Sequence, residues 1–151
     1  MKSLCILLCS VLMCFAVTAC TSSTALELQN ATRNSGASRI YFIRPSTIVS
    51  AGQTVRVTVN DKQVGSLGIG TYLHIDRPAG QYRLAVDHPL DFGKTELTVS
   101  ITPENEYYFK IFPGGSSVAA VGGYGAAVSN KLGIAGISEA EGKALMRDMK
   151  Q

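Results

Sequence analysis

Apolar and polar residues alternate along much of the chain between residues 39 and 112, with the period of two that is typical of β-strands. The clearest example is 54–60, in which three valines alternate with polar residues. Asn60 and Asp61 tolerate a positive φ, so the chain is expected to turn there into a second strand over 64–67. Further strands are expected over 39–44, 71–76, 82–87, 96–101 and 107–112.

These short strands follow one another at intervals of about 10 to 15 residues, with no long helical pattern between them. The sequence therefore predicts an all-β fold, a small antiparallel β-sandwich or open barrel, as a single domain over 39–112. The segments 39–44 and 107–112 carry apolar side chains on both faces. We expect these two strands to be central or covered.

The composition changes after residue 112. Residues 113–137 form a segment rich in glycine and small residues, with two interpretations. A loop or weak edge strand is favoured, because each glycine inside a helix costs about 1 kcal/mol. The alternative is a helix with a stripe of small residues at Ala119, Gly123 and Ala127. Self-association or membrane contact through 117–129 is a further hypothesis.

The last segment, 138–151, is predicted to be a helix. Ser138 can accept a hydrogen bond from the amide of Glu141 while Glu141 reaches back, which is the pattern of a capping box. Leu145 and Met149 lie one helical turn apart. They are expected to place a narrow apolar stripe on the sheet.

The first residues have the layout of a secretory signal, with Lys2 followed by an uncharged apolar run over 4–17. Val17-Thr18-Ala19-Cys20 resembles the lipobox of bacterial lipoproteins. The resemblance implies a signal peptide at 1–19 and a mature chain that begins at Cys20, with an S-diacylglycerol group and an N-acyl chain such as palmitate. The alternatives are an uncleaved short anchor and cleavage by ordinary signal peptidase.

Thr21 is not the aspartate that retains such lipoproteins in the inner membrane, so the same resemblance implies the periplasmic face of the outer membrane in a Gram-negative source. The polar segment 20–38 is predicted to be a flexible tether with a root-mean-square span of about 20 to 25 Å. The alternation over 26–28 leaves a second interpretation, a strand or helical turn that docks on the domain.

Charge and cysteine content limit the kinds of partner and site that the sequence allows. The 14 Lys and Arg residues and 11 Asp and Glu residues are spread without a basic block, which argues against a nucleic-acid partner. Cys5, Cys9 and Cys14 lie in the predicted signal peptide and Cys20 would carry lipid. The mature chain is then expected to have no disulfide, no thiolate nucleophile and no cysteine metal ligand.

His74 and Asp76 share one face of a predicted strand and are the best pair for a metal or an acid-base role. Arg56 and Arg83 face outward and are candidates to bind a carboxylate or phosphate. The favoured interpretation is an exposed strand face whose arginines pair with neighbours such as Glu96 and Asp76. We expect no catalytic residues, no metal and no cofactor.

Four stretches resemble the bacterial lipoproteins grouped as domain of unknown function 2846, and their turns are similar to those of PEGA-type β modules. They are 39–45, 57–65, 70–72 and 78–82. The resemblance implies a small β-sandwich on an envelope lipoprotein and brings no catalytic residues with it.

The leading hypothesis is a non-catalytic, lipid-anchored envelope protein that contacts other envelope proteins or peptidoglycan. The alternative is a small ligand-binding or hydrolytic protein that uses His74, Asp76, Arg56 and Arg83. A buried pocket joining these side chains would favour the alternative. A solid apolar core with both histidines on open faces would favour the leading hypothesis.

Overall fold

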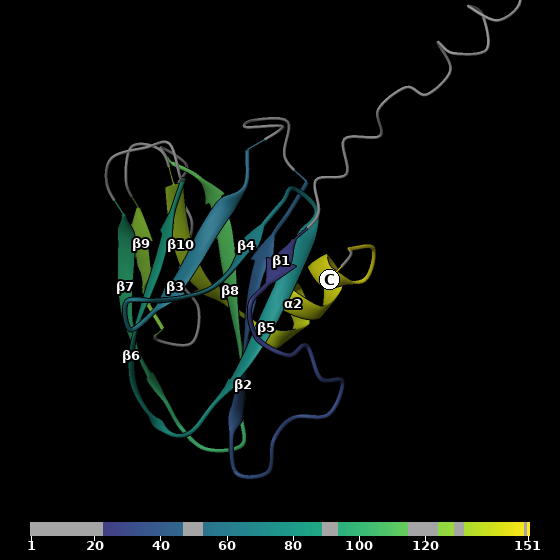
Figure 1. Cartoon of the computed structure of the whole chain (residues 1–151), viewed down its shortest axis with the longest axis vertical. Helices are drawn as coiled ribbons and strands as arrows, with labels where there is room; N and C mark the ends of the chain where they lie inside the picture. The colour runs from purple at the N-terminus through teal and green to yellow at the C-terminus, as the bar shows by residue number, and fades with distance from the viewer. Residues whose placement is uncertain (1–22, 47–52, 89–93, 115–123, 129–131, 150) are drawn as a thin grey trace, which may run out of the picture.

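The computed structural model of the protein describes residues 23–46, 53–88, 94–114, 124–128, 132–149 and 151. Two five-stranded sheets face each other, and one helix lies beside them (Figure 1). The elements are β1 (Thr24–Ala25), β2 (Ser38–Arg44), β3 (Val55–Val59), β4 (Lys62–Leu67), β5 (Thr71–Arg77), β6 (Gly80–Asp87), β7 (Thr95–Ile101), β8 (Glu106–Pro113), β9 (Ala126–Val128), β10 (Leu132–Ile137) and α2 (Glu139–Met146). The predicted signal peptide and Cys20 lie outside the described residues.

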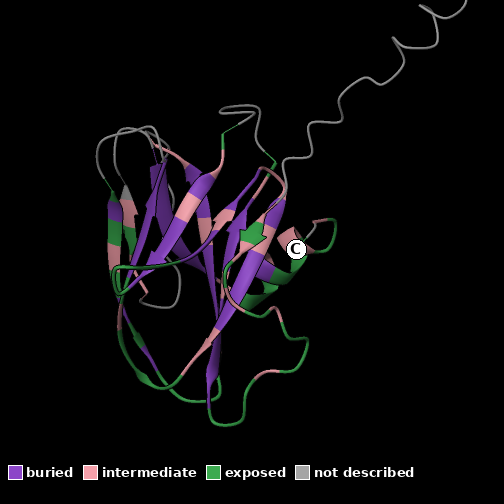
Figure 2. Cartoon of the chain, in the orientation of Figure 1, coloured by how far each residue is buried: buried purple, intermediate pink, exposed green. Residues whose placement is uncertain are grey.

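The strand order is β1-β4-β3-β6-β7 in the first sheet and β5-β2-β8-β10-β9 in the second. The alternating apolar side chains of both sheets point into one shared core, and Figure 2 shows the buried residues concentrated in the strands. The valines of β3 are 0 to 4% exposed. The hairpin from β3 to β4 turns at Asn60 (φ 47°) and Asp61 (φ 64°). The predicted β-sandwich is therefore confirmed.

Strand β2 is central, as its two apolar faces predict. It pairs antiparallel with β5 on one side and parallel with β8 on the other. Ile40 and Phe42 lie in the core between the sheets, whereas Ile43 faces the helix side with Tyr108. The parallel pair departs from the purely antiparallel sandwich that the short strand spacing predicts.

The glycine-rich segment differs in part from both interpretations. Strand β10 is buried between β8 and β9, so it is not an edge strand, and Ala127 lies in the edge strand β9 rather than in a helix. A Cβ on Gly133 would lie 2.2 Å from Cζ of Phe112, so the absence of a side chain at Gly133 leaves room for this ring. Ala119 and Gly123, like most of the hypothesised contact segment 117–129, lie outside the described residues.

The C-terminal helix is confirmed, although it ends at Met146 rather than at residue 151. Ser138 Oγ accepts a hydrogen bond from the amide of Glu141 at 3.2 Å, as predicted. Leu145 and Met149 pack against a small cluster that contains Ile43 and Tyr108. In the described ranges, no helix combines the length and the apolar character needed to cross a bilayer.

Residues 23–34 do not form the predicted flexible tether. Strand β1 pairs antiparallel with β4, and the amide of Leu26 donates to the carbonyl of Val64 at 2.9 Å. A Cβ on Gly65 would lie 2.6 Å from the carbonyl oxygen of Thr24, so this glycine lets the segment approach. The alternative interpretation, a short strand docked on the domain, is the one that the structure shows.

Candidate functional site

The N-terminal segment covers the outer face of β5 and buries the side chain of His74. Gln29 pairs with His74 through its side chain: its Nε2 donates to the carbonyl of His74 at 2.9 Å, and its Oε1 accepts from the amide of His74 at 2.8 Å. The carbonyl of Asn30 lies 3.1 Å from Nε2 of the imidazole, and Nε2 of Gln151 lies 2.9 Å from its Nδ1. His74 is therefore held between the two ends of the described chain.

These contacts indicate which ring nitrogen of neutral His74 carries the proton. The side-chain amide of Gln151 donates to Nδ1, so the proton of the neutral ring lies on Nε2 and is donated to Asn30. Burial, followed by the positive charge of Arg39, lowers the pKa of His74. A neutral, fully hydrogen-bonded imidazole is a structural group here.

Arg39 and Asp76 form a buried ion pair beside His74. Nε of Arg39 donates to Oδ1 of Asp76 at 2.7 Å and Nη2 donates to Oδ2 at 3.0 Å, in the bidentate geometry that favours this pairing. The amide of Asn34 also donates to Asp76, and Nη1 of Arg39 donates to the carbonyl of Ala31. The ion pair therefore fixes the loop over 31–34.

Burial alone would raise the pKa of Asp76. The hydrogen bonds from Arg39 and from the Asn34 amide, together with the charge of Arg39, outweigh it and hold the pKa of Asp76 below its ordinary value. The hydrogen bond to Asp76 raises the pKa of Arg39 in turn. Asp76 is thus an ionised carboxylate at neutral pH and is not suited to act as a general acid or base there.

The four sequence-predicted site residues do not meet at one place. His74 and Asp76 lie on β5 in the second sheet, whereas Arg56 on β3 and Arg83 on β6 lie in the first sheet. Both arginines form ion pairs, as expected, but with partners other than those predicted: Arg56 pairs with Asp87 and Arg83 with Asp61.

The condition that both histidines lie on open faces is not met, and the expected exposed strand face at His74 is wrong. His74 is 3% exposed and His88 is 5% exposed. His74 is buried because the N-terminal segment docks on it, and the sequence pattern does not predict the path of that segment. The core between the sheets is apolar, so the structure meets one of the two conditions for the leading hypothesis and does not join the four polar side chains of the alternative.

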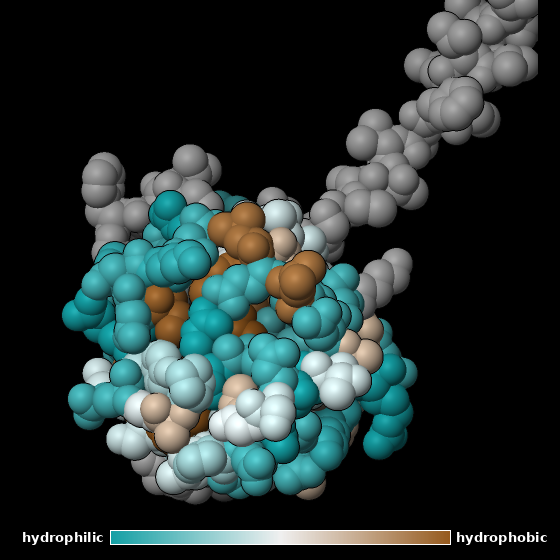
Figure 3. All heavy atoms as spheres, turned by 60° about the horizontal axis from the view of Figure 1, so that its bottom comes forward, coloured by the Kyte–Doolittle hydropathy of each residue, from teal (hydrophilic) through white to brown (hydrophobic). Residues whose placement is uncertain are grey.

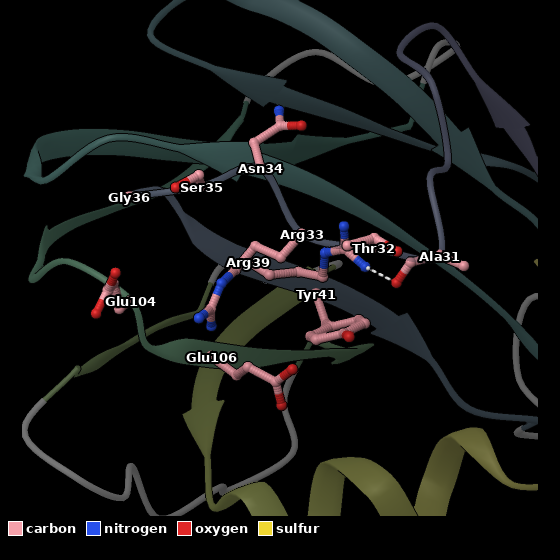
Figure 4. A pocket seen from close by; sticks show the side chains of 10 residues that line it. All are labelled: Ala31, Thr32, Arg33, Asn34, Ser35, Gly36, Arg39, Tyr41, Glu104 and Glu106. Carbon is pink, nitrogen blue, oxygen red and sulfur yellow. Dashed lines mark hydrogen bonds between the residues drawn. The ribbon is translucent and has the colours of Figure 1, made fainter.

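The structure instead contains a polar hollow of about 420 Å³ between the loop over 31–36 and the start of β8. Figure 4 shows the side chains around it. They are Ala31, Thr32, Arg33, Asn34, Ser35, Gly36, Arg39, Tyr41, Glu104 and Glu106. The ion pair of Arg39 with Asp76 secures one wall of this hollow.

Aromatic stacking secures the neighbouring part of the hollow at Tyr41, which lies on β2 with Arg39. The rings of Tyr41 and Tyr108 stack at 4.8 Å with an interplanar angle of 7°, and the hydroxyl of Tyr108 donates to Glu106 at 2.5 Å. Burial, followed by the hydrogen bond to Glu106, raises the pKa of Tyr108 well above its usual range. Burial and the nearby charge of Glu106 also raise the pKa of Tyr41. Both phenols are therefore neutral donors rather than bases.

The remaining charged groups face the hollow without a partner. Among the residues that the structure describes, neither the guanidinium of Arg33 nor the carboxylate of Glu104 takes part in a hydrogen bond or ion pair. In Figure 4 the side chain of Arg33 extends toward the side where Glu104 and Glu106 lie. Glu104 has a positive φ of 60°, a conformation that usually favours Gly or Asn.

Sequence reasoning misses this hollow because two of its charges, Arg33 and Glu104, come from a loop and a turn outside the strands. The sequence offers one signal, the turn residues Pro103 and Asn105 on either side of Glu104. The arrangement offers a cation, two carboxylates and a tyrosine to a ligand that carries both charges. In the described part of the chain, no three His, Cys, Asp or Glu side chains gather closely enough to hold a metal ion.

Comparison with known proteins identifies one relationship. A family model described as a protein of unknown function (DUF2846) matches residues 34–124, which is more than half of the chain. No curated protein and no solved structure matches the chain. The matched region includes the loop over 34–36, the ion pair of Arg39 with Asp76 and both glutamates of the hollow.

Proposed function

We propose that this chain, which belongs to the DUF2846 family, is a lipid-anchored lipoprotein of the bacterial cell envelope that acts by binding rather than catalysis. Cys20 carries the lipid, and the periplasmic face of the outer membrane is the proposed location. The residues Val17-Thr18-Ala19-Cys20 support the anchor. Two or more acyl chains make such an anchor stable where one chain would be marginal.

The polar hollow supports the binding role. Its walls are fixed by the Arg39–Asp76 ion pair and by stacked tyrosines, so it is preorganised and a ligand would not have to order it. The observation that carries the proposal is that the charges of Arg33 and Glu104 line the hollow and pair with none of the described residues. Peptidoglycan stem peptides and protein segments carry amino and carboxylate groups and suit such a lining.

The alternative of a hydrolytic or ligand-binding site formed by His74, Asp76, Arg56 and Arg83 has no such support. His74 and Asp76 lie in one sheet and the two arginines in the other, and each of the four side chains forms a hydrogen bond or ion pair within the domain. We infer that these residues stabilise the fold and that the hollow is the place to look for a partner.

Mass spectrometry of the N-terminal peptide from membrane-bound protein tests the anchor. The expected mass is that of Cys20 with a diacylglyceryl group and an N-acyl chain. A peptide with the mass of the unmodified amino acids, from protein that washes off membranes, would contradict the anchor.

Sedimentation with purified peptidoglycan and cross-linking in the envelope test the binding role. Removing one charge of the hollow, in Arg33→Gln or Glu104→Gln, is expected to reduce the bound fraction several-fold. Arg147→Gln is the matched control, because Arg147 is exposed and forms no ion pair with a described residue, but lies after α2 rather than at the hollow. Binding and cross-links that are the same in all three variants would refute a role for the hollow.

A further inference from the structure

Two leucines follow β1 with their side chains in solvent. Leu26 is 58% exposed and Leu28 is 83% exposed, and among the described residues these are the large apolar side chains that lie open. Figure 3 shows that apolar side chains reach a surface that is otherwise largely hydrophilic. A single exposed leucine is ordinary on a protein surface. Two on one short segment require an explanation.

The alternation of the segment places both leucines on one side. Glu27 and Gln29 face the domain: Glu27 accepts two hydrogen bonds from Arg77, at 2.9 and 2.6 Å, and Gln29 pairs with the backbone of His74. Burial alternates along the segment, because Leu26 and Leu28 are exposed whereas Glu27 and Gln29 are partly buried, so both leucines face solvent. The leucine pair, Leu26 with Leu28, is therefore an ordered surface rather than part of a loose tail.

The distance along the chain to the proposed lipid anchor limits where this surface lies. Ser23, the first described residue, is three residues from Cys20, and an extended chain spans about 3.3 to 3.6 Å per residue. The start of the domain therefore lies within about 10 Å of a lipidated Cys20. A spacer of 20 to 25 Å, as a flexible segment over 20–38 would give, is not available, because residues 23–34 are bound to the sandwich.

We propose that the leucine pair is the membrane-docking surface of the domain and that it contacts the headgroup and upper acyl region of the bilayer that holds the anchor. This inference rests on the lipid anchor proposed above. Apolar side chains on a polar background gain from burial at this interface, and no order is lost because the segment is already fixed. The anchor supplies attachment, whereas the leucine pair supplies a defined orientation.

The experiment uses the full-length lipidated protein in vesicles of phosphatidylethanolamine and phosphatidylglycerol. After processing and lipidation no free thiol is expected, so Leu28→Cys introduces the one site for a nitroxide label. Thr98→Cys is the control, because Thr98 is also exposed but lies on β7, the edge strand opposite β1 in the same sheet. Collision of the label with oxygen, which concentrates in lipid, is compared with collision with a water-soluble nickel chelate.

The expected result is a ratio of oxygen to nickel collisions several-fold higher at position 28 than at position 98. Equal ratios in protein that is acylated and retained on vesicles would overturn the docking surface and leave the anchor intact. Unacylated protein that does not bind vesicles would overturn the anchor and the docking surface together. Strong spin–spin broadening at position 28 would show that a second copy covers the leucine pair, which would also overturn the proposal.

Discussion

The arginines of this protein show that one residue type serves different purposes according to burial. Arg39 and Asp76 keep only 5% and 8% of their side chains exposed, whereas Arg83 and Asp61 keep 45% and 59%. An exposed pair contributes little, because water and salt screen it. Removing one partner of a buried pair leaves an uncompensated charge in the protein, which is expensive.

Asp76→Asn is therefore expected to lower the free energy of unfolding by about 3 kcal/mol at pH 7. Asp61→Asn makes the same chemical change on the surface and is expected to cost less than about 1 kcal/mol. Urea unfolding followed by circular dichroism measures both. Equal losses in the two variants would contradict a stabilising role for the buried pair.

The same pair sets the acid limit of stability. The pKa of Asp76 is lowered in the folded state. The resulting stabilisation is fully present above the pKa of an aspartate in the unfolded chain, about 3.9, and is lost as the pH falls through the lowered pKa of the folded state. The unfolding free energy of the wild type should decline in this window. The decline should be shallower in Asp76→Asn.

At the scale of elements, two glycines decide what packs against the sheets. Gly133 makes room for the ring of Phe112, and Gly65 makes room for the N-terminal segment. The sequence pattern predicts strands where apolar residues alternate with polar ones. It does not predict β10 as a buried strand, because small residues and glycines carry no alternation and the contacts that bury them come from distant aromatic rings.

Gly65→Ala is expected to displace β1, since the new Cβ would lie 2.6 Å from the carbonyl oxygen of Thr24 and 2.7 Å from Cδ2 of Leu73. The readout is hydrogen exchange at the amide of Leu26, which should become at least about tenfold faster as local opening becomes easier. Ser66→Ala, at the neighbouring position of β4, is the control and should leave this amide protected. Unchanged protection in Gly65→Ala would mean that the glycine is not required for docking.

How far the sequence predicts the structure depends on the element. The hairpin at Asn60 and Asp61, the covered strand β2 and the cap at Ser138 follow from local chemistry and are confirmed. The order of the N-terminal segment does not follow from local chemistry. It depends on side chains such as Gln29, which hydrogen-bonds to the backbone of His74, a residue far away in the sequence. The hollow is missed for the same reason: its walls are brought together by tertiary contacts.

At the scale of the whole molecule, His74 connects the N-terminal segment, the sheet and Gln151. Burial and the charge of Arg39 lower its pKa in the folded state, against the smaller opposing effects of the bond to Asn30 and the charge of Asp76. The unfolded chain therefore binds a proton at a higher pH than the folded chain. Stability should rise with pH through this window and should be complete above about pH 6.5.

The unfolding free energy is thus expected to fall between pH 7 and pH 5, by at most about 1.4 kcal/mol for each pH unit below 6.5. The variant His74→Gln lacks the imidazole at position 74 and should lose the part of this slope that His74 contributes, whatever its overall stability. Urea unfolding across this pH range is the measurement. An identical slope in the variant would assign the pH dependence to other groups.

The parallel pairing of β2 with β8 has a consequence for the time at which the protein can fold. Arg39 on β2 lies opposite Glu106 on β8. Strand β2 therefore cannot complete its pairing until β8, which is synthesised much later, is available. Folds rich in such distant pairings form slowly, in milliseconds to seconds. The export proposed above would require an unfolded chain, and slow pairing of β2 with β8 would keep the chain unfolded until it has crossed the membrane.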